Sequence, residues 1–241
     1  MNQSAHAKNL TVEDFVAALQ IRTVPASKPM AQRHHFQWER KLFHVASGLL
    51  VLSIYAFTNI SRAWSIALLL TALGIALTTE FVRHRLPAVN RWVCRWCHCL
   101  MRDHERHRLS SATWYLIGMS TLVALFPRSV GIMTLWFMAC GDTAAGIVGS
   151  RWGRIRLTTH CSLEGLSAGF LACAVGAWLI AGWCLPDFQL HGAALWKFSL
   201  LAGLIGALAE GCVKWKHLDD NVAIPLISAP LLWSAMYWFT F

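Results

Sequence analysis

The chain has 241 residues, of which 56% are hydrophobic and 14% are charged, and its formal net charge is +9. A soluble domain is typically about 25% charged, so this composition excludes an ordinary soluble globular protein and indicates a chain built mainly of membrane helices. The excess of positive charge is explained below by orientation in the membrane, and no nucleic acid is expected as a partner. The eight cysteines are scattered and follow no secretory signal, so structural disulfides are not expected.

Residues 1–39 are predicted to form a polar N-terminal arm, followed by a membrane domain over residues 40–241. Within the arm, apolar residues between Val12 and Ile21 share one face of a helix. This pattern favours a short helix lying on the bilayer surface, without activity of its own.

Apolar segments follow at regular intervals along the chain. They are Leu42–Phe57, Trp64–Val82, Ala112–Phe126, Val130–Val148, Leu166–Leu185, Leu195–Val213 and Val222–Phe239. Most approach the roughly 20 residues that a helix needs to cross the hydrocarbon core, although the first and third are short. Such runs without two-residue alternation favour helices in lipid. The prediction is an all-α, polytopic membrane protein with about seven transmembrane helices.

The basic residues predict an orientation for these helices. When the connections are assigned alternately to two sides, 18 of the 21 lysines and arginines fall on the side of the N-terminal arm. Only Arg62, Arg128 and Lys197 fall on the other side. The positive-inside rule then places the N-terminus in the cytoplasm and the C-terminus outside. Most carboxylates also fall on the basic side, which this rule does not explain, so we expect an active-site cavity at the cytoplasmic face.

The first candidate cluster lies at the start of the first apolar segment. Arg40, Lys41 and His44 are close enough in sequence to share one helix face and to point into one cavity. Arg40 and Lys41 also suit a simple topology anchor. His44, just inside the apolar run, favours a functional role.

The second cluster lies in the basic loop that follows Val82. Apolar side chains between residues 92 and 100 recur at helical spacing opposite arginines, which predicts an amphipathic interfacial helix. The sequence Cys94-Arg-Trp-Cys97-His98 matches a haem-attachment pattern, and nearby Cys and His residues offer a zinc site. Both signals are weak, and we favour cysteines packed as small apolar residues. Arg102 and Glu105 are the better site candidates.

Asp142 is the strongest signal, because its carboxylate interrupts the fourth apolar segment. An ionised group at the bilayer centre costs roughly a few kcal/mol and is a functional-site hypothesis by default. With the helix expected to end near Val148, Asp142 lies about two turns, or ~9 Å, below that end. The following turn combines glycines and arginines that suit a nucleotide phosphate, namely Gly149, Arg151, Gly153, Arg154 and Arg156. The alternative is a helix-packing seam of small residues, with Asp142 as an interhelical hydrogen-bonding residue.

The last cluster stands before the final apolar segment. It begins with Glu210 and continues with Asp219, Asp220 and Asn221. The last three residues suit either a divalent cation, which takes hard oxygen ligands, or the N-cap of the last helix. A cap explains one of the three residues. We therefore favour a metal or nucleotide role.

Taken in order, these clusters resemble the family of CTP-dependent membrane lipid kinases that includes dolichol kinase, phytol kinase and the fungal CTP-dependent diacylglycerol kinase. The resemblance spans Arg40 to Pro225. It rests on Arg40-Lys41-x-x-His44, Asn90-Arg91, Met101-Arg102-x-x-Glu105, Trp114-Tyr115-x-x-Gly118, Gly141-Asp142-Thr143-Ala144-Ala145 with Gly149 and Gly153, Ser162-Leu163-Glu164-Gly165, and Asp219-Asp220-Asn221 with Pro225. It implies transfer of the γ-phosphoryl group of CTP to a lipid hydroxyl, diacylglycerol first and polyprenol second, with Mg²⁺ as cofactor.

The resemblance also implies residue roles. Asp142 is expected to act in catalysis and, with Asp219 or Asp220, to hold Mg²⁺, and Glu105 or His44 to accept the proton of the lipid hydroxyl. The nucleotide and its phosphates are assigned to Lys41, Arg102, Gly149, Arg151, Gly153, Arg154, Arg156, Ser162, Glu164 and Asn221. One departure is Cys161, which stands where the family usually has a lysine. It favours an altered donor, an altered acceptor or lost catalysis unless Arg154 or Arg156 substitutes.

Two other classes remain open from the residues. A phosphatidate cytidylyltransferase would attack the α-phosphate of CTP and release pyrophosphate, and a non-catalytic relative would bind lipid without nucleotide turnover. The expected partners are CTP, a lipid alcohol from the bilayer and a possible second copy of the chain. The expected location is a bacterial inner membrane.

Overall fold

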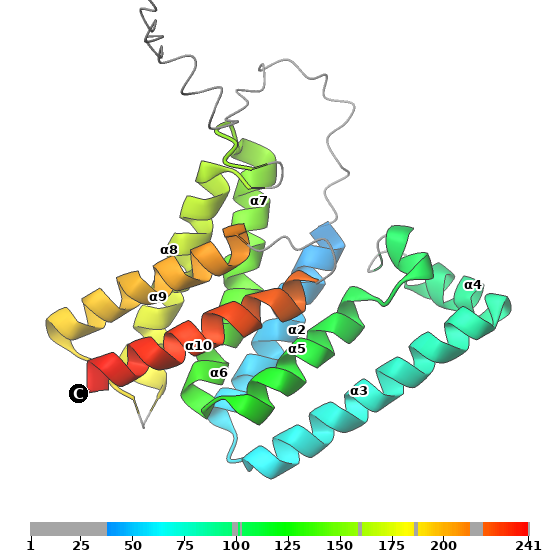
Figure 1. Ribbon diagram of the computed structural model, residues 1–241, viewed down its shortest axis with the longest axis horizontal. Helices are drawn as coiled ribbons and strands as arrows, with labels where there is room; N and C mark the ends of the chain where they lie inside the picture. The colour runs from blue at the N-terminus through cyan, green and yellow to red at the C-terminus, as the bar shows by residue number, and fades with distance from the viewer. Residues whose placement is uncertain are drawn as a thin grey trace, which may run out of the picture.

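The computed structural model describes residues 38–97, 101, 103–158, 161–185, 188–212 and 219–240, so the predicted surface helix of the N-terminal arm lies outside the described residues. In chain order the α-helices are α2 (Trp38–Phe57), α3 (Arg62–Arg85), α4 (Pro87–Trp96), α5 (Ser111–Leu125), α6 (Arg128–Trp136), α7 (Asp142–Trp152), α8 (Leu163–Leu179), α9 (Gly192–Cys212) and α10 (Asp220–Thr240) (Figure 1). Shorter segments are the 3₁₀ helix η2 (Asp103–His107) and the π-helical turns η3 (Phe137–Gly141) and η4 (Ile180–Cys184).

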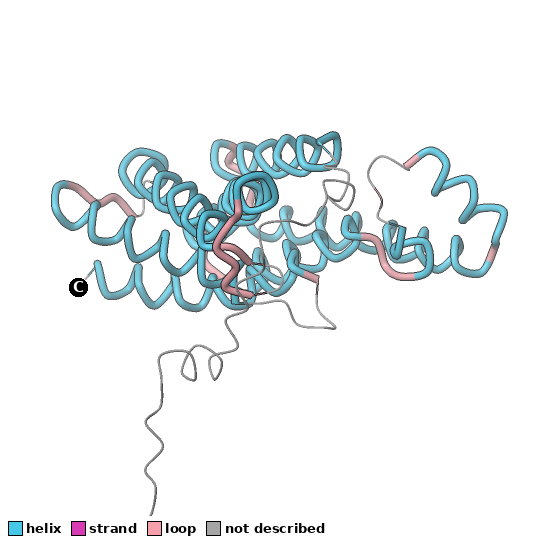
Figure 2. The backbone as a smooth tube through the Cα atoms, turned by 90° about the horizontal axis from the view of Figure 1, so that it is seen from above, coloured by secondary structure: helices cyan, strands magenta, loops and turns pink. Residues whose placement is uncertain are grey.

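The described chain is helical, with short connections between the helices and no strand drawn in the tube view (Figure 2). Five of its helices are long and apolar enough to cross a membrane, namely Arg62–Arg85, Arg128–Trp152, Leu163–Cys184, Gly192–Gly211 and Asp220–Thr240. Two shorter apolar helices, Lys41–Phe57 and Ser111–Leu125, coincide with the first and third predicted segments. The all-helical membrane class is thus confirmed, while the number of crossings and the orientation stay predictions.

The helix formed by α6, η3 and α7 is central to the packing. Of its apolar window 67% is buried, against 11% for α3, which lies at the edge of the molecule beside α5 (Figure 1). The side chains of Val130, Met133 and Leu135 in α6 are completely buried. The most buried of the candidate membrane spans is therefore the one that carries Asp142.

This central helix is longer than the hydropathy predicted. It continues through Gly149 to Trp152, so the expected end near Val148 is wrong, and Asp142 lies ten residues from the true end, roughly 15 Å at 1.5 Å per residue. Hydropathy falls at Gly149 because the helix leaves the apolar region there, but contacts with the start of α8 keep the next turn helical. The connection to α8 shortens to residues 153–162.

Candidate functional site

The π-helical turn η3 sets the direction in which α7 begins. Trp136, just before η3, donates its indole N–H to the carbonyl oxygen of Ala172 on α8 at 2.9 Å. Gly141, at the end of η3, faces the thiol of Cys173 so closely that a Cβ atom there would clash. Single π turns inside α-helices occur frequently at functional sites. Here the turn delivers Asp142 as the first residue of α7.

Asp142 is half-buried, and its carboxylate makes no hydrogen bond or ion pair with any described residue. Gly146 follows one turn later on the same face of α7. The Nζ atom of Lys41, from α2, lies 2.5 Å from the point where a Cβ atom on Gly146 would stand. The structure therefore brings Lys41 to the helix face that carries Asp142. A carboxylate that has no partner among the described residues, beside an ammonium group and inside the most buried candidate span, is a candidate binding site for a charged ligand.

His44 contacts the same region from α2. Its Nε2 atom lies 3.1 Å from the carbonyl oxygen of Met138 in η3, so Nε2 donates and Nδ1 is the acceptor in the neutral ring. The ring packs edge to face against Tyr115 of α5, with centroids 5.4 Å apart. The hydroxyl of Tyr115 is buried and has no hydrogen-bond partner among the described residues. Tyr115 belongs to the sequence block Trp114-Tyr115-x-x-Gly118, and only the fold places it beside His44.

A second polar chain links η2, α5 and α10. The carboxylate of Glu105, 2% exposed, accepts the hydroxyl hydrogen of Ser111 at 2.7 Å. The carbonyl oxygen of Ser111 accepts from the side-chain amide of Asn221 at 3.4 Å, and the same amide donates to Asp219 at 2.7 Å. The backbone of Asn221 fills the space where a side chain on Gly118 would stand, which is why the two helices can approach. Glu105, Asn221 and Asp219 are thus brought together.

Asp219 acts as the N-cap of α10. Its carboxylate accepts the backbone N–H of Asn221 at 3.0 Å, and its carbonyl oxygen accepts the backbone N–H groups of Val222 and Ala223. No group of three or more His, Cys, Asp or Glu side chains in the described ranges is placed to hold a metal ion. Magnesium usually takes only one or two carboxylates together with phosphates, and its assignment to Asp142 with Asp219 or Asp220 stays a prediction.

Gly149, Gly153 and Ser162 belong to the contact between α7 and α8. Ser162 is the buried N-cap of α8, and its Oγ atom accepts the backbone N–H of Gly165 at 3.1 Å. A Cβ atom on Gly149 would lie 3.2 Å from this oxygen, and one on Gly153 would lie 2.5 Å from it. Close packing therefore explains these glycines, as in the alternative interpretation of this segment, and their role in phosphate binding stays a prediction.

The basic turn after α7 is exposed but anchored at both ends. The side chains of Arg151, Arg154 and Arg156 are exposed. The carboxylate of Glu164 accepts the backbone N–H of Ile155 at 3.2 Å, and an isolated β-bridge pairs Arg156 with Ser162. These contacts hold the arginines near the start of α8. Arg102, the remaining predicted phosphate ligand, lies outside the described residues.

Sequence reasoning missed a buried charged network at the end of α3. Arg83 is 2% exposed and donates to the carboxylate of Glu80 at 2.8 Å and to the carbonyl oxygen of Glu105 at 3.0 Å. Glu80 also accepts the backbone N–H of Ser110 at 3.1 Å. Arg83 thereby holds the segment that carries Glu105. The sequence signal for this network is an acidic and a basic residue at i,i+3 near the end of an apolar run. Arg83 directly follows the predicted segment Trp64–Val82, so the hydropathy pattern assigns it to the connection instead.

The fold also brings Glu210, the first residue of the last sequence cluster, close to α8. Gly169 of α8 lies between this residue and the central helix. A Cβ atom added to Gly169 would lie 3.1 Å from a carboxylate oxygen of Glu210 and 3.6 Å from the carbonyl oxygen of Gly141. Both Glu210 and Asp142 interact electrostatically with Cys173. A carboxylate from α9 therefore reaches the seam from which Asp142 emerges.

The helix α4 covers the first part of the predicted amphipathic segment, with Trp92 and Trp96 exposed, and its location at the membrane interface stays a prediction. The thiol of Cys94 donates to the side-chain oxygen of Asn90 at 3.4 Å, as expected for a packed cysteine. His98 of the weak haem and zinc patterns lies outside the described residues.

Comparison with known proteins identifies relatives of this chain. No family model matches the chain, and no solved structure is similar to it. CTP-dependent diacylglycerol kinase 1 of Schizosaccharomyces pombe is 30% identical over 206 residues, which cover 82% of this chain and 92% of the relative. The enzyme of that name from Saccharomyces cerevisiae is 28% identical over 209 residues, covering 79% and 70%. Probable phytol kinase 1, chloroplastic, of Oryza sativa subsp. japonica is 30% identical over 200 residues, covering 78% and 60%.

The apolar helices and these relatives together define the class of membrane-embedded lipid kinases. Within that class, the chain belongs to the family of CTP-dependent lipid kinases, which confirms the resemblance drawn from its sequence blocks.

Proposed function

We propose that this protein transfers the γ-phosphoryl group of CTP to the hydroxyl group of a membrane lipid, with diacylglycerol as the first acceptor and a polyprenol as the second. The observation that carries the proposal is the carboxylate of Asp142 in the most buried candidate span, which has no partner among the residues that the structure describes and lies on the helix face that Lys41 reaches. The relatives named diacylglycerol kinase support the choice of acceptor.

The nucleotide side of the reaction is assigned to α2, α7 and the basic turn. Phosphoryl transfer requires in-line positioning and neutralisation of charge rather than covalent help from the protein. Lys41 would bind the transferred phosphate, and Arg151, Arg154 and Arg156, with Arg102, would hold the rest of the triphosphate. Mg²⁺ would be held by Asp142 with Asp219 or Asp220, and when bound it neutralises phosphate charge.

The two candidate proton acceptors, His44 and Glu105, differ in their hydrogen bonds and in their burial. His44 contacts the turn that precedes Asp142 and keeps Nδ1 as its acceptor atom. Glu105 is almost completely buried and already accepts from Ser111. We therefore assign acceptance of the lipid hydroxyl proton to His44 and assign Glu105 to the positioning of α5 and α10.

The second candidate function is that of a non-catalytic relative, because Cys161 stands where the family usually has a lysine. Its thiol lies 3.4 Å from the position of a Cβ atom on Gly211, so the side chain points towards α9. The β-bridge brings the backbone of Arg156 beside Ser162, the residue that follows Cys161. This neighbourhood supports Arg156 as the substitute for the lysine that the family usually carries here.

The reaction is proposed to occur at the cytoplasmic face of a bacterial inner membrane. The distribution of basic residues supports this orientation. The lipid would enter sideways from the bilayer, with its hydroxyl group at headgroup level.

The test is a transfer assay on purified protein in detergent with Mg²⁺, in which γ-labelled CTP or ATP is offered with diacylglycerol or a polyprenol. We expect label to move from CTP to diacylglycerol, and Asp142→Asn to abolish the transfer. Lys41→Met should also abolish it, whereas the matched control Lys197→Met, in α9, should not.

Two outcomes would contradict the proposal. Release of pyrophosphate from CTP with phosphatidate as acceptor would identify a cytidylyltransferase. Lipid binding with no nucleotide binding by the folded protein would identify a non-catalytic relative.

A further inference from the structure

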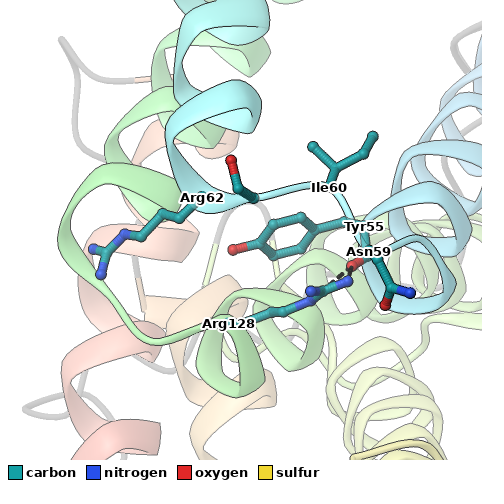
Figure 3. Close-up of a pocket in the computed structure, with 6 residues that line it drawn as sticks. Tyr55, Asn59, Ile60, Arg62 and Arg128 are labelled. Carbon is teal, nitrogen blue, oxygen red and sulfur yellow. Dashed lines mark hydrogen bonds between the residues drawn. The ribbon is translucent and has the colours of Figure 1, made fainter.

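A cavity with a volume of about 280 Å³ lies between the end of α2 and the starts of α3 and α6. Its lining residues are Tyr55, Asn59, Ile60, Ser61, Arg62 and Arg128 (Figure 3). Lys41 and Tyr55 are separated by 14 residues of α2, and Arg128 and Asp142 by 14 residues of the central helix, which is roughly 21 Å in each case. The cavity is therefore at the opposite end of these two helices from the candidate active site.

The polar groups that line the cavity are suited to an anion. They include two guanidinium groups and no carboxylate. The helices α3 and α6 both begin here, so the positive ends of their dipoles lie in this region. Neither helix has an acidic residue in its first turn that would offset this charge. By the distribution of charge along the sequence, only three lysines and arginines belong to this side of the protein. The fold places two of those three at one cavity.

Helix capping uses only part of each arginine. Arg62 donates Nε–H and Nη2–H to carbonyl oxygens at the end of α5, and Arg128 donates the same two groups to carbonyl oxygens at the end of α2. Each side chain retains its Nη1 group, for which no partner exists among the described residues. Both guanidinium groups are therefore held in place and can still donate.

Tyr55 adds a third polar group to the two guanidinium groups of the cavity. The side chain is 8% exposed, and its hydroxyl makes no hydrogen bond to any described residue. Its ring lies between Arg62 and Arg128 at the cavity, with the hydroxyl directed into it (Figure 3). The hydroxyl atom is not fully buried, so it is accessible to a ligand in the cavity and can donate a hydrogen bond to it.

The loop that lines the cavity is flanked in the sequence by exposed aromatic side chains. Phe57 and Trp64, on either side of the loop, are 72% and 69% exposed. Aromatic side chains of this kind gather at the level of lipid headgroups, so the acyl chains of a bound lipid would have an apolar surface to follow. The volume is at the lower limit for small-molecule pockets, which are about 300–1,000 Å³, and suits a headgroup phosphate rather than a nucleotide.

We propose that this cavity binds the phosphate of an anionic phospholipid headgroup, held by Arg62, Arg128 and the hydroxyl of Tyr55. The site is separate from the proposed active site, and its occupation does not depend on kinase activity. A bound lipid would join the end of α2 to the starts of α3 and α6.

The test is a titration of the purified full chain in detergent with phosphatidylglycerol, followed by native mass spectrometry. We expect one tightly bound lipid in the wild type, with a dissociation constant that rises about tenfold or more in Tyr55→Phe and in Arg62→Gln. Tyr55→Phe removes only the hydroxyl and keeps the packed ring, so it distinguishes lost binding from lost folding. The matched control is Lys197→Gln, which should bind as the wild type does.

Equal affinity in the wild type and in both cavity variants would overturn the proposal, and so would an equal loss in Lys197→Gln. Inorganic phosphate is the second arm. Weak competition at millimolar concentration is expected for a lipid site, whereas complete displacement of the lipid would overturn the lipid assignment in favour of a free anion.

Discussion

Lys41 reaches α7 because residue 146 has no side chain. The Nζ atom occupies a point 2.5 Å from the missing Cβ atom of Gly146, one turn from Asp142. The sequence suggested Lys41 and Asp142 as candidates from separate segments. Their proximity depends on how α2 packs against the central helix.

Gly146→Ala is expected to lower transfer activity by about tenfold to a hundredfold, because displacement of a catalytic group by about 1 Å can cost that much. The fold should survive, since the atom that must move is at the far end of a flexible lysine side chain. Activity and the thermal unfolding midpoint would both be measured. Gly74→Ala is the matched control, because nothing lies within 4 Å of its added Cβ atom; full activity in Gly146→Ala would contradict the role of Lys41.

At the scale of elements, the segment between α4 and α5 depends on one arginine from α3. Arg83 reaches the carbonyl oxygens of Glu105 and Arg108 and pairs with Glu80, so two charges and two backbone groups are satisfied together. Glu105 in turn contacts Ser111 at the start of α5. The geometry of η2 is thus set by a helix that contributes little to the central core.

Arg83→Met is expected to destabilise the protein by about 3–5 kcal/mol, because it leaves the buried carboxylate of Glu80 without its charged partner. The loss would appear as a lower thermal unfolding midpoint in detergent. Arg85→Met is the matched control on the same helix, since that side chain is exposed and lies over Phe81. Equal effects of the two substitutions would show that the network contributes nothing.

For the whole molecule, the charge distribution predicts an odd number of crossings and termini on opposite sides. Every apolar segment predicted from the sequence coincides with an apolar helix, two of them short. The short ones, which include the first helix with Lys41 and His44, are still needed for the alternation of basic connections.

We therefore expect a fluorescent protein fused after Phe241 to remain dark in a bacterial host, because such a fusion folds poorly outside the cytoplasm, and an alkaline phosphatase fused there to be active. The same pair fused in the turn between α7 and α8 should give the reverse result. A fluorescent C-terminal fusion would show an even number of crossings or the opposite orientation.

The sequence by itself determined the helical membrane class and the candidate spans and indicated Asp142 as a candidate site residue, because hydrophobic runs and a carboxylate within one of them are local properties. It also carried enough ordered motifs to indicate the family, which the relatives confirm. Only the tertiary structure decided which helix is central, where α7 ends, and which side chains meet. The contacts of His44 with Tyr115 and of Arg83 with Glu105, and the cavity shared by Arg62 and Arg128, join residues from separate helices, and helix packing has no one-dimensional signature that places such pairs together.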